Sequence, residues 1–221
     1  MPYVEASVRS RQLVEAARRV LIRDGAGRLT MRAVAAEAGV LLGTVTYVFK
    51  SKEMLLRAVI EDVTAEIAEF LKSSPDTGRG LEHAIRQGLD RFWVTLVEEQ
   101  EGLQIIQYEL TIYALRTPGL ESLARWQYDR YARIVAAWCQ EAASHAGETC
   151  AVPFDTLARV LVAGMDGLIL QYVCDPDMTR ARGDLQAVTE MVISLASPAG
   201  RRAQAGRPGR LTHRLNRCTY Y

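Results

Sequence analysis

Apolar residues recur every three or four positions along most of the chain, which is the spacing of amphipathic helices. The segment after Ser51 is the clearest example, with four apolar residues at i, i+4 positions: Leu55, Val59, Val63 and Ile67. No segment shows the sustained alternation of apolar and polar residues that indicates a half-buried strand. The pattern therefore predicts an all-α protein.

Glycine, proline and capping residues divide this pattern into about nine helices and no strand. After a first helix that ends before Gly25, the expected ranges are roughly 30–38, 42–48, 52–71, 80–99, 103–116, 120–144, 155–174 and 182–195. The last residues, 198–221, are rich in Pro, Gly and Arg and have almost no apolar periodicity, which is typical of a disordered segment.

The charge distribution supports a division into three parts. The formal net charge is only +1. Residues 1–52 carry nine Lys or Arg and four Asp or Glu, a net +5; residues 53–197 carry twelve and twenty-two, a net −10; residues 198–221 carry six and none, a net +6. A basic head on an acidic body suggests an anionic partner for the head. We expect a DNA-binding domain over 1–52, a larger helical domain over 53–197 and a basic tail over 198–221.

Several classes of protein are not expected. Four cysteines in 221 residues are too few for a disulfide scaffold. The first residues lack the apolar segment of a signal peptide, and the run Val160–Met165 is broken by Asp166, so we expect a cytoplasmic protein without a membrane span. No catalytic motif is present, and the group His145, Glu148 and Cys150 is more simply a loop than a metal site. We therefore expect no enzymatic activity, no cofactor and no metal.

The segment Met31–Val48 has the residue pattern that a helix-turn-helix requires. Its tight turn needs a residue that tolerates positive φ, which Gly39 supplies, and the close approach of two helices needs a small residue, which Ala35 supplies. Inner faces need apolar residues, and five are present: Val34, Ala38, Val40, Val45 and Val48. A plain helical hairpin within a bundle is the alternative interpretation.

Residues 11–60 resemble the DNA-binding domain of the TetR family of transcriptional regulators. The stretch Leu29–Val40 (LTMRAVAAEAGV) matches the family's second helix and turn, and Gly43–Leu56 (GTVTYVFKSKEMLL) matches its third helix and the start of its fourth. The resemblance implies an N-terminal three-helix DNA-binding domain followed by a larger helical domain for ligand binding and dimerisation. It also implies a homodimer on a palindromic operator of double-stranded DNA, and a repressor that a small, largely apolar effector releases.

The resemblance and the chemistry of the side chains suggest a set of DNA contacts. Hydroxyls and cations suit phosphate oxygens, and Gly43 allows the backbone to approach DNA closely. Leu41 stands where the family usually has a small polar residue, so Leu41 and Leu42 either contact thymine methyl groups or simply pack. The expected set is Arg28, Thr30, Arg32, Leu41, Leu42, Gly43, Thr44, Thr46, Tyr47, Lys50 and Lys52. Tyr47 could instead belong to the small core, and Thr30 could only cap its helix.

The resemblance places the dimer interface on the last two helices. Gly164 and Gly167 lie inside the first of them, where glycine costs roughly 1 kcal/mol relative to alanine, and close helix approach is the favoured explanation over a neutral surface position. The expected interface residues are Leu161, Gly164, Met165, Leu168 and Val192.

A ligand pocket is expected between residues 80 and 144, which hold eight aromatic residues: Phe92, Trp93, Tyr108, Tyr113, Trp126, Tyr128, Tyr131 and Trp138. Four are favoured as ligand contacts: Trp93, Tyr108, Tyr113 and Trp126. Aromatic residues at helical spacing are more often core, so each has that alternative. For the whole protein, the alternative function is a helical dimeric protein-interaction module without sequence-specific DNA binding.

Overall fold

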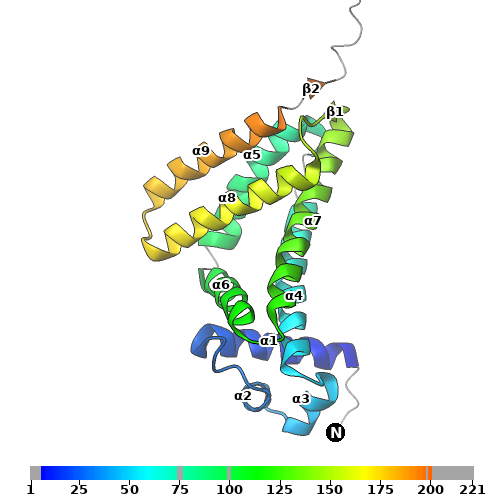
Figure 1. Cartoon of the computed structure of the whole chain (residues 1–221), viewed down its shortest axis with the longest axis vertical. Coiled ribbons are helices and arrows are strands. Elements are labelled where there is room, and N and C mark those ends of the chain that lie inside the picture. Colours follow the sequence, from blue (N-terminus) through cyan, green and yellow to red (C-terminus); the bar gives the residue numbers. More distant parts are fainter. Residues whose placement is uncertain (1–5, 74–76, 99–100, 198, 201–221) are drawn as a thin grey trace, which may run out of the picture.

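The computed structural model describes residues 6–73, 77–98, 101–197 and 199–200, and these form nine α-helices in a smaller head and a larger body (Figure 1). The all-α prediction is confirmed. The head contains α1 (Ala6–Asp24), α2 (Met31–Glu37) and α3 (Leu42–Val48), and α4 (Lys52–Lys72) leads from it into the body. The body contains α5 (Leu81–Phe92), α6 (Glu101–Arg116), α7 (Glu121–Ala146), α8 (Phe154–Cys174) and α9 (Met178–Ala196).

Short polar side chains set several of the helix starts. The hydroxyl of Thr30 accepts a hydrogen bond from the Ala33 N–H at 3.0 Å, and Ser51 and Asp177 cap α4 and α9 in the same way. One expected boundary is different. The predicted helix over 80–99 is divided into two segments: α5, which ends at Phe92, and a π-helical segment, Trp93–Glu98. A single 3₁₀ turn, Thr77–Arg79, precedes α5.

The head does not have a core of its own that ends at residue 52. The buried residues Leu13, Val20, Val34 and Val45 of the three short helices pack with four residues from the first half of α4: Leu55, Leu56, Val59 and Ile60. The same cluster includes residues of α6 and of the start of α7: Ile106, Leu110, Ala114, Leu123 and Ala124. The hydrophobic core of the head is therefore shared with the body.

In the body, α8 and α9 lie side by side, α8 crosses α7 and α9 packs on α5 (Figure 1). Helix α8 has the length and composition of a membrane-crossing helix, with a mean hydropathy of 1.5 in its most apolar window, and the bent pair α2–α3 passes the same test when taken as one span. The expectation that no stretch is long and apolar enough to cross a membrane is therefore wrong by length and composition. Helix α8 packs on α7 and α9, but only 33% of that window is buried in the protomer. Part of the apolar surface of α8, including Leu170, is therefore exposed in the protomer.

The described part of the predicted tail consists of two residues. Ala199 and Gly200 form β2, which pairs antiparallel with β1, Glu148–Thr149, at the end of the body far from the head (Figure 1). The remainder of the expected disordered segment 198–221 lies outside the described residues. This two-residue pair is the one departure, among the described residues, from an arrangement without strands.

Candidate DNA interface and ligand pocket

Helices α2 and α3 form a helix-turn-helix in which the chain bends by 115° between the two helices. Gly39 in the turn has a φ of +63°, a conformation that glycine adopts without strain. The Val40 N–H donates to the Ala35 carbonyl at 3.0 Å, which closes the turn, and Val34, Ala35 and Val45 are buried beneath it. The geometry predicted from the positions of Gly39 and Ala35 is thus present.

Most of the expected DNA contacts lie on the exposed side of this motif. Leu41 is 81% exposed and Tyr47 is 77% exposed, so neither belongs to the small core. The Lys50 ammonium lies 5.0 Å from the centre of the Tyr47 ring. Six further residues of the expected set are exposed: Arg28, Thr30, Arg32, Leu42, Gly43 and Thr46; Thr44 is half-buried. A cluster of apolar, hydroxyl and cationic groups is therefore presented together around α3.

Two of the expected contacts also have partners within the protein. The Thr46 hydroxyl bonds back to the carbonyls of Leu42 and Gly43 at 3.2 Å, although its side chain stays exposed. The Lys52 ammonium is half-buried and donates to the Tyr113 hydroxyl at 2.9 Å, which lowers the pKa of that phenol. Lys52 therefore joins the head to α6 in this structure, a role that the sequence pattern did not indicate.

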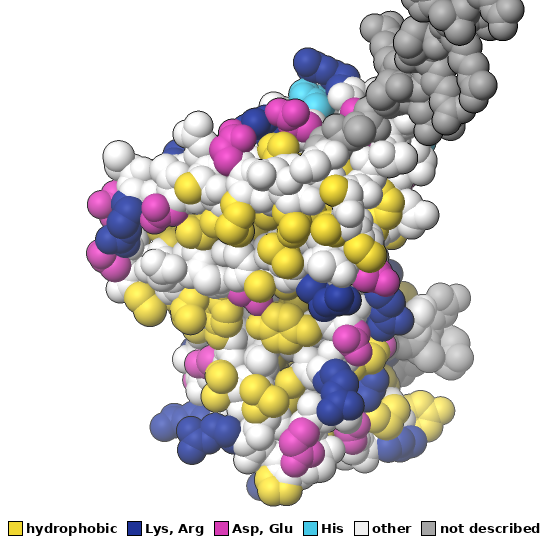
Figure 2. Space-filling view, turned by 45° about the horizontal axis from the view of Figure 1, so that its top comes forward, with side chains coloured by type: hydrophobic (Ala, Val, Ile, Leu, Met, Phe, Trp, Pro, Cys, Tyr) yellow, Lys and Arg dark blue, Asp and Glu magenta, His cyan; other side chains and the backbone are white. Residues whose placement is uncertain are grey.

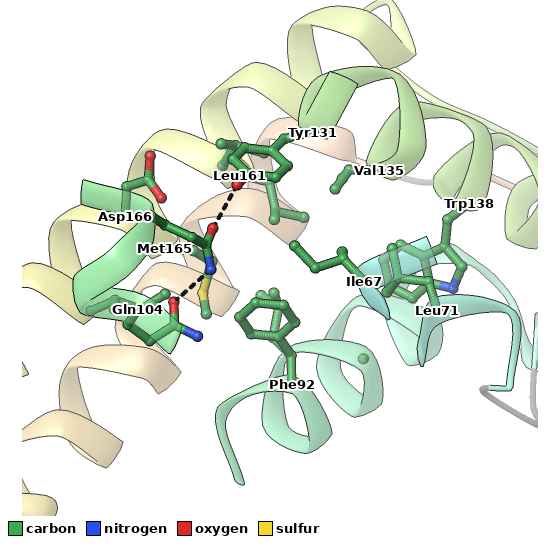
Figure 3. Close-up of a pocket in the computed structure, with 15 residues that line it drawn as sticks. Ile67, Leu71, Phe92, Gln104, Tyr131, Val135, Trp138, Leu161, Met165 and Asp166 are labelled. Atoms are coloured by element: carbon green, nitrogen blue, oxygen red, sulfur yellow. Dashed lines mark hydrogen bonds between the residues drawn. The ribbon is translucent and has the colours of Figure 1, made fainter. Parts of the chain in front are cut away.

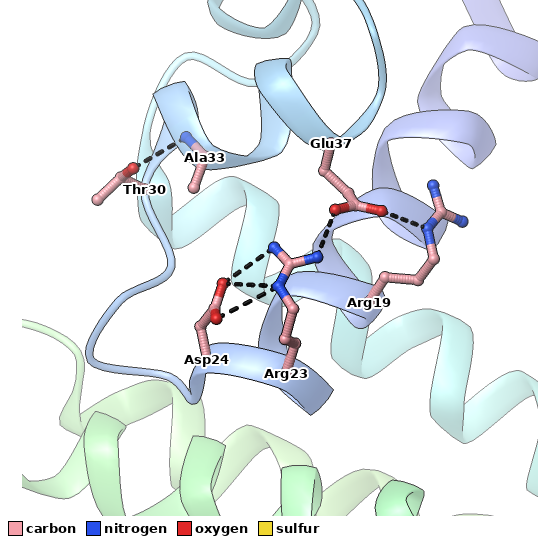
Figure 4. A network of polar contacts seen from close by, with 6 residues as sticks. All are labelled: Arg19, Arg23, Asp24, Thr30, Ala33 and Glu37. Carbon is pink, nitrogen blue, oxygen red and sulfur yellow. Dashed lines mark hydrogen bonds and ion pairs between the residues drawn. The ribbon is translucent and has the colours of Figure 1, made fainter.

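An ion-pair network fixes α2 against α1 (Figure 4). The Glu37 carboxylate of α2 accepts from Arg23 at 2.7 Å and from Arg19 at 2.8 Å, and these contacts hold its pKa below the usual range. Arg23 also pairs with Asp24 at 3.0 Å. The network is exposed, so its main effect is to orient α2 rather than to add much stability.

The body encloses a cavity of about 70 Å³ between α4, α5, α6, α7 and α8 (Figure 3). Its wall is mostly apolar and is formed by Ile67, Leu71, Leu89, Phe92, Val135, Trp138, Leu161, Val162, Met165 and Ile169. Gly88 also lines the cavity, and a Cβ at this position would lie 2.5 Å from the Trp138 ring. The missing side chain of Gly88 therefore makes the space that the indole occupies.

Polar groups gather at one end of this cavity. Figure 3 shows Asp166, Gln104 and Tyr131 on one side and Leu71 and Trp138 on the opposite side. The Tyr131 hydroxyl donates to Gln107 Oε1 at 2.6 Å, and Gln107 donates in turn to Gln104 Oε1 at 3.4 Å. A smaller adjoining space is lined by Tyr108, Thr111, Gln127 and Tyr128 together with Asp166. The pocket thus has an apolar end and a polar end.

The structure brings one of the four favoured aromatic residues to the pocket. Tyr108 lines its polar end and donates to the backbone carbonyl of Asp166 at 2.8 Å. Trp93 is fully buried beside Tyr172, Tyr113 contacts Lys52, and Trp126 lies under the Arg57 guanidinium at 4.9 Å. In this structure Trp93 is core, and Tyr113 and Trp126 face the head and α4, so these three do not line this cavity.

Four of the five expected dimer residues are buried inside the protomer, and Gly164 is half-buried. Leu161, Met165, Leu168 and Val192 are all at most 9% exposed, and a Cβ on Gly164 would lie 2.9 Å from Val188 of α9. These residues pack the body core and the α8–α9 contact within one chain, and the expectation that they form the dimer interface stays a prediction. Close helix approach does explain Gly164, but between helices of one chain.

Other apolar residues of α8 and α9 are exposed, and we call the surface that carries them the α8–α9 face. Its large members are Leu170 and Met191, which are 47% and 51% exposed. Small exposed residues complete it: Ala163, Gly167 and Ala187. Figure 2 shows hydrophobic side chains in a band over these two helices. The face is continuous with the uncovered apolar surface of α8.

A helix-turn-helix head on a helical body with an internal cavity defines the class of ligand-responsive transcriptional regulators. Two family models match the chain: bacterial regulatory proteins of the tetR family over residues 13–59, and the tetracyclin repressor-like C-terminal domain over residues 80–198. The chain belongs to the TetR family. Members are DNA-binding transcriptional regulators rather than enzymes, as the sequence predicts.

Individual relatives agree with this assignment. The chain is 30% identical over 172 residues to the HTH-type nicotine-responsive transcriptional repressor HdnoR of Paenarthrobacter nicotinovorans, covering 78% of this chain and 87% of the relative. The multidrug binding protein EbrR, solved with ethidium, is 27% identical with a TM-score of 0.62, over 85% of this chain and 98% of EbrR. A TetR-family member from Streptomyces coelicolor A3 is 28% identical with a TM-score of 0.62, over 85% and 98% of the two chains.

Proposed function

We propose that this protein is a cytoplasmic repressor that binds a palindromic operator as a homodimer and is released by a small, hydrophobic ligand in the body cavity. The two heads of a dimer read two half-sites about one DNA turn, roughly 34–36 Å, apart. Leu41, Leu42 and Thr46 contact bases, while Tyr47 and Lys50 contact phosphates. HdnoR is named a transcriptional repressor, which supports the proposed repressor role. EbrR was solved with ethidium, which supports the proposed binding of a small, hydrophobic ligand.

The observation that carries the proposal is that α6 contacts both the cavity and the head. Gln104 and Gln107 of α6 line the cavity. Two further residues of α6 hold the head: Glu109 Oε2 accepts from the Ala26 N–H at 2.9 Å, and the Tyr113 hydroxyl accepts from Lys52 at 2.9 Å. A shift of α6 therefore acts on the cavity and the head at once.

The size of the cavity gives a reason for such a shift. Ligand pockets in proteins usually measure about 300–1,000 Å³. The cavity here is about 70 Å³, so a ligand larger than a few water molecules has to separate the surrounding helices. Binding then favours a state in which α6 has moved and the heads no longer match the operator. The coupling free energy expected for this kind of switch is about 1–3 kcal/mol.

Dimerisation is proposed through the α8–α9 face rather than through the buried residues first expected. Leu170 and Met191 lie on that face, and only 33% of the most apolar window of α8 is buried in the protomer. Exposed apolar patches of this kind mark interaction sites in soluble proteins. A second copy covers the face with the same residues, as two-fold symmetry requires.

Fluorescence anisotropy with labelled DNA tests the proposal. The probe is a duplex from just upstream of the protein's own gene that carries an inverted repeat, and a scrambled duplex of the same length is the control. We expect the repeat to bind at least about a thousandfold more tightly, with affinity falling steeply as salt rises. Equal binding to both duplexes, or none to either, would favour the protein-interaction module instead.

A further inference from the structure

We infer that the ligand is an amine with an aromatic, apolar body that is positively charged at neutral pH, and that the Asp166 carboxylate is its counter-ion. This inference rests on the proposed function, because it names the chemical class of ligand for the same cavity. Three features of the pocket lead to it: the single carboxylate, the unpaired acceptor at the polar end, and the apolar wall opposite.

Asp166 is the one charged side chain among the described residues that line the two connected spaces. It lies in the middle of α8, and none of the ion pairs between described residues involves it. The Tyr128 hydroxyl donates to its carboxylate, while burial raises its pKa. A carboxylate withdrawn from water without a cation is costly, and a bound cation removes that cost.

The described part of the polar end has engaged hydroxyl donors and one buried acceptor without a partner. Its four hydroxyl donors are all engaged within the site: Tyr108 with the Asp166 carbonyl, Tyr128 with the Asp166 carboxylate, Tyr131 with Gln107, and Thr111 with the Gln107 carbonyl. Gln127 is 1% exposed, and its Nε2 donates to Tyr131 at 3.0 Å. Its Oε1 has no hydrogen-bond partner.

A buried acceptor without a donor is destabilising, so a ligand that brings N–H groups is favoured here. The polar end offers such a ligand two acceptors, the Asp166 carboxylate and Gln127 Oε1. A carboxylate or phosphate ligand would meet the Asp166 charge and find its hydroxyl donors already occupied. The arrangement therefore selects a cation with at least one N–H over an anion.

The other end of the cavity sets the shape of the rest of the ligand. Phe92, Leu71 and Trp138 lie opposite Asp166 in Figure 3, and the neighbouring wall is aliphatic. Aromatic and aliphatic side chains favour an apolar ring system. A charged amine at one end and a ring at the other matches this polarity.

Calorimetric titration of the full-length protein with two pairs of probes tests the inference. Each pair has one cation and one uncharged compound of similar shape: proflavin with acridine, and 2-phenylethylamine with 2-phenylethanol, all at mildly alkaline pH. We expect at least one cation to bind about tenfold or more tightly than its uncharged partner, which corresponds to about 1.4 kcal/mol. Equal or tighter binding of the uncharged compounds, or no binding of either cation, would overturn the inference.

Variants assign the preference to Asp166. Asp166→Asn keeps an acceptor for Tyr128 and is expected to lower the affinity for the cation about tenfold while leaving that for the uncharged partner unchanged. Asp166→Glu is expected to retain the preference. Asp129→Asn, which removes an exposed carboxylate from α7, is the matched control for net charge and is expected to change neither affinity. Equal loss for both members of a pair in Asp166→Asn would show a structural role and overturn the inference.

Failure of this inference is distinguishable from failure of the proposed function. Operator binding is measured on the same preparation by anisotropy. A protein that binds its operator but prefers uncharged probes retains the proposed function and contradicts the counter-ion role. A protein that prefers cations but does not discriminate the operator from scrambled DNA supports the pocket chemistry and contradicts the repressor.

Discussion

Glu109 of α6 accepts a hydrogen bond from the backbone N–H of Ala26, across 83 positions of sequence, at 2.9 Å. The carboxylate also lies against Gly25, where a Cβ would be 3.1 Å from Oε2 and where φ is +77°. The loop between α1 and α2 is therefore shaped to receive this side chain. It is a direct contact between the helix that lines the cavity and the head.

Weakening this contact is expected to weaken communication between the ligand and DNA. Glu109→Gln keeps the shape but replaces a charge-assisted hydrogen bond with a neutral one, which is about half as strong. We expect the ligand-induced change in operator affinity to fall by at least half, with a loss of stability of about 1 kcal/mol or less. Anisotropy with and without ligand measures the change. Glu141→Gln, at an exposed position of α7, is the control, and an unchanged ligand response in Glu109→Gln would contradict the role of α6.

Filling the space at Gly88 is expected to displace Trp138 and reduce the cavity. The added Cβ would lie 2.5 Å from the indole, so the ring or α5 has to move. Overpacking costs about 1–3 kcal/mol, partly offset by up to about 1 kcal/mol of helix propensity. Thermal melting of Gly88→Ala and calorimetry of ligand binding measure both effects. Gly183→Ala in α9, where nothing lies within 4 Å, is expected to keep ligand affinity and to stabilise slightly; wild-type ligand affinity in Gly88→Ala would refute the prediction.

A carboxylate on the α8–α9 face is expected to separate the dimer. Leu170→Asp would place an unpaired charge in the proposed interface, where the cost is roughly 3 kcal/mol or more and the dissociation constant rises at least about a hundredfold. Sedimentation velocity measures the change at micromolar concentration. Leu115→Asp changes a leucine of α6 that is 55% exposed and is expected to leave the dimer intact. An intact Leu170→Asp dimer would place the interface elsewhere.

Two substitutions near α3 are expected to separate base recognition from phosphate attraction. Leu41→Ala is expected to reduce the preference for operator over scrambled DNA by about 1 kcal/mol or more through loss of a methyl contact, without a change in thermal stability, because Leu41 is 81% exposed. Lys50→Ala is expected to weaken binding to both duplexes and to reduce the salt slope by about 2 per dimer. A lower melting temperature in Leu41→Ala would show that this side chain supports the fold instead.

The stability of the free protein is expected to depend on Asp166 and on pH. Burial raises the pKa of its carboxyl in the folded state, so the folded form binds protons more strongly than the unfolded form and stability falls as pH rises through that range. Asp166→Asn is therefore expected to melt at a higher temperature than the wild type at neutral pH. The difference should shrink in acid, where the wild-type carboxyl is protonated. Thermal melts over a pH series measure it, and a variant less stable than the wild type at neutral pH would contradict the prediction.

The head could be predicted from sequence because its determinants are local. Gly39, Ala35 and the apolar positions of α2 and α3 lie within 18 residues of one another, and each has one geometric role. The net positive charge of residues 1–52 also indicated that the head binds an anionic partner. The contact of Lys52 with Tyr113 spans 61 positions, and no local pattern indicates it.

The pocket and the dimer face could not be predicted to the same extent, because periodicity does not say which apolar face is covered by what. Helix α8 is apolar on nearly every side, so Leu161 and Leu170 look alike in sequence although one is buried and the other is 47% exposed. Of the aromatic residues favoured as ligand contacts, Tyr108 alone lines the pocket. The signal for the proposed ligand site is Asp166, a charge inside the mostly apolar stretch 160–174 of α8, which the sequence interpretation treated only as an interruption.

The division of roles between helices has a practical consequence. The wall of the cavity and its carboxylate come mainly from α5, α7 and α8, whereas the contacts with the head come from Glu109 and Tyr113 of α6. In the proposed mechanism, most of the groups that select the ligand lie outside the transmitting helix, although Gln104 and Gln107 of α6 also line the cavity. A biosensor for a new analyte is therefore attainable by redesigning the wall alone, with the transmitting helix and the reading head retained as they are.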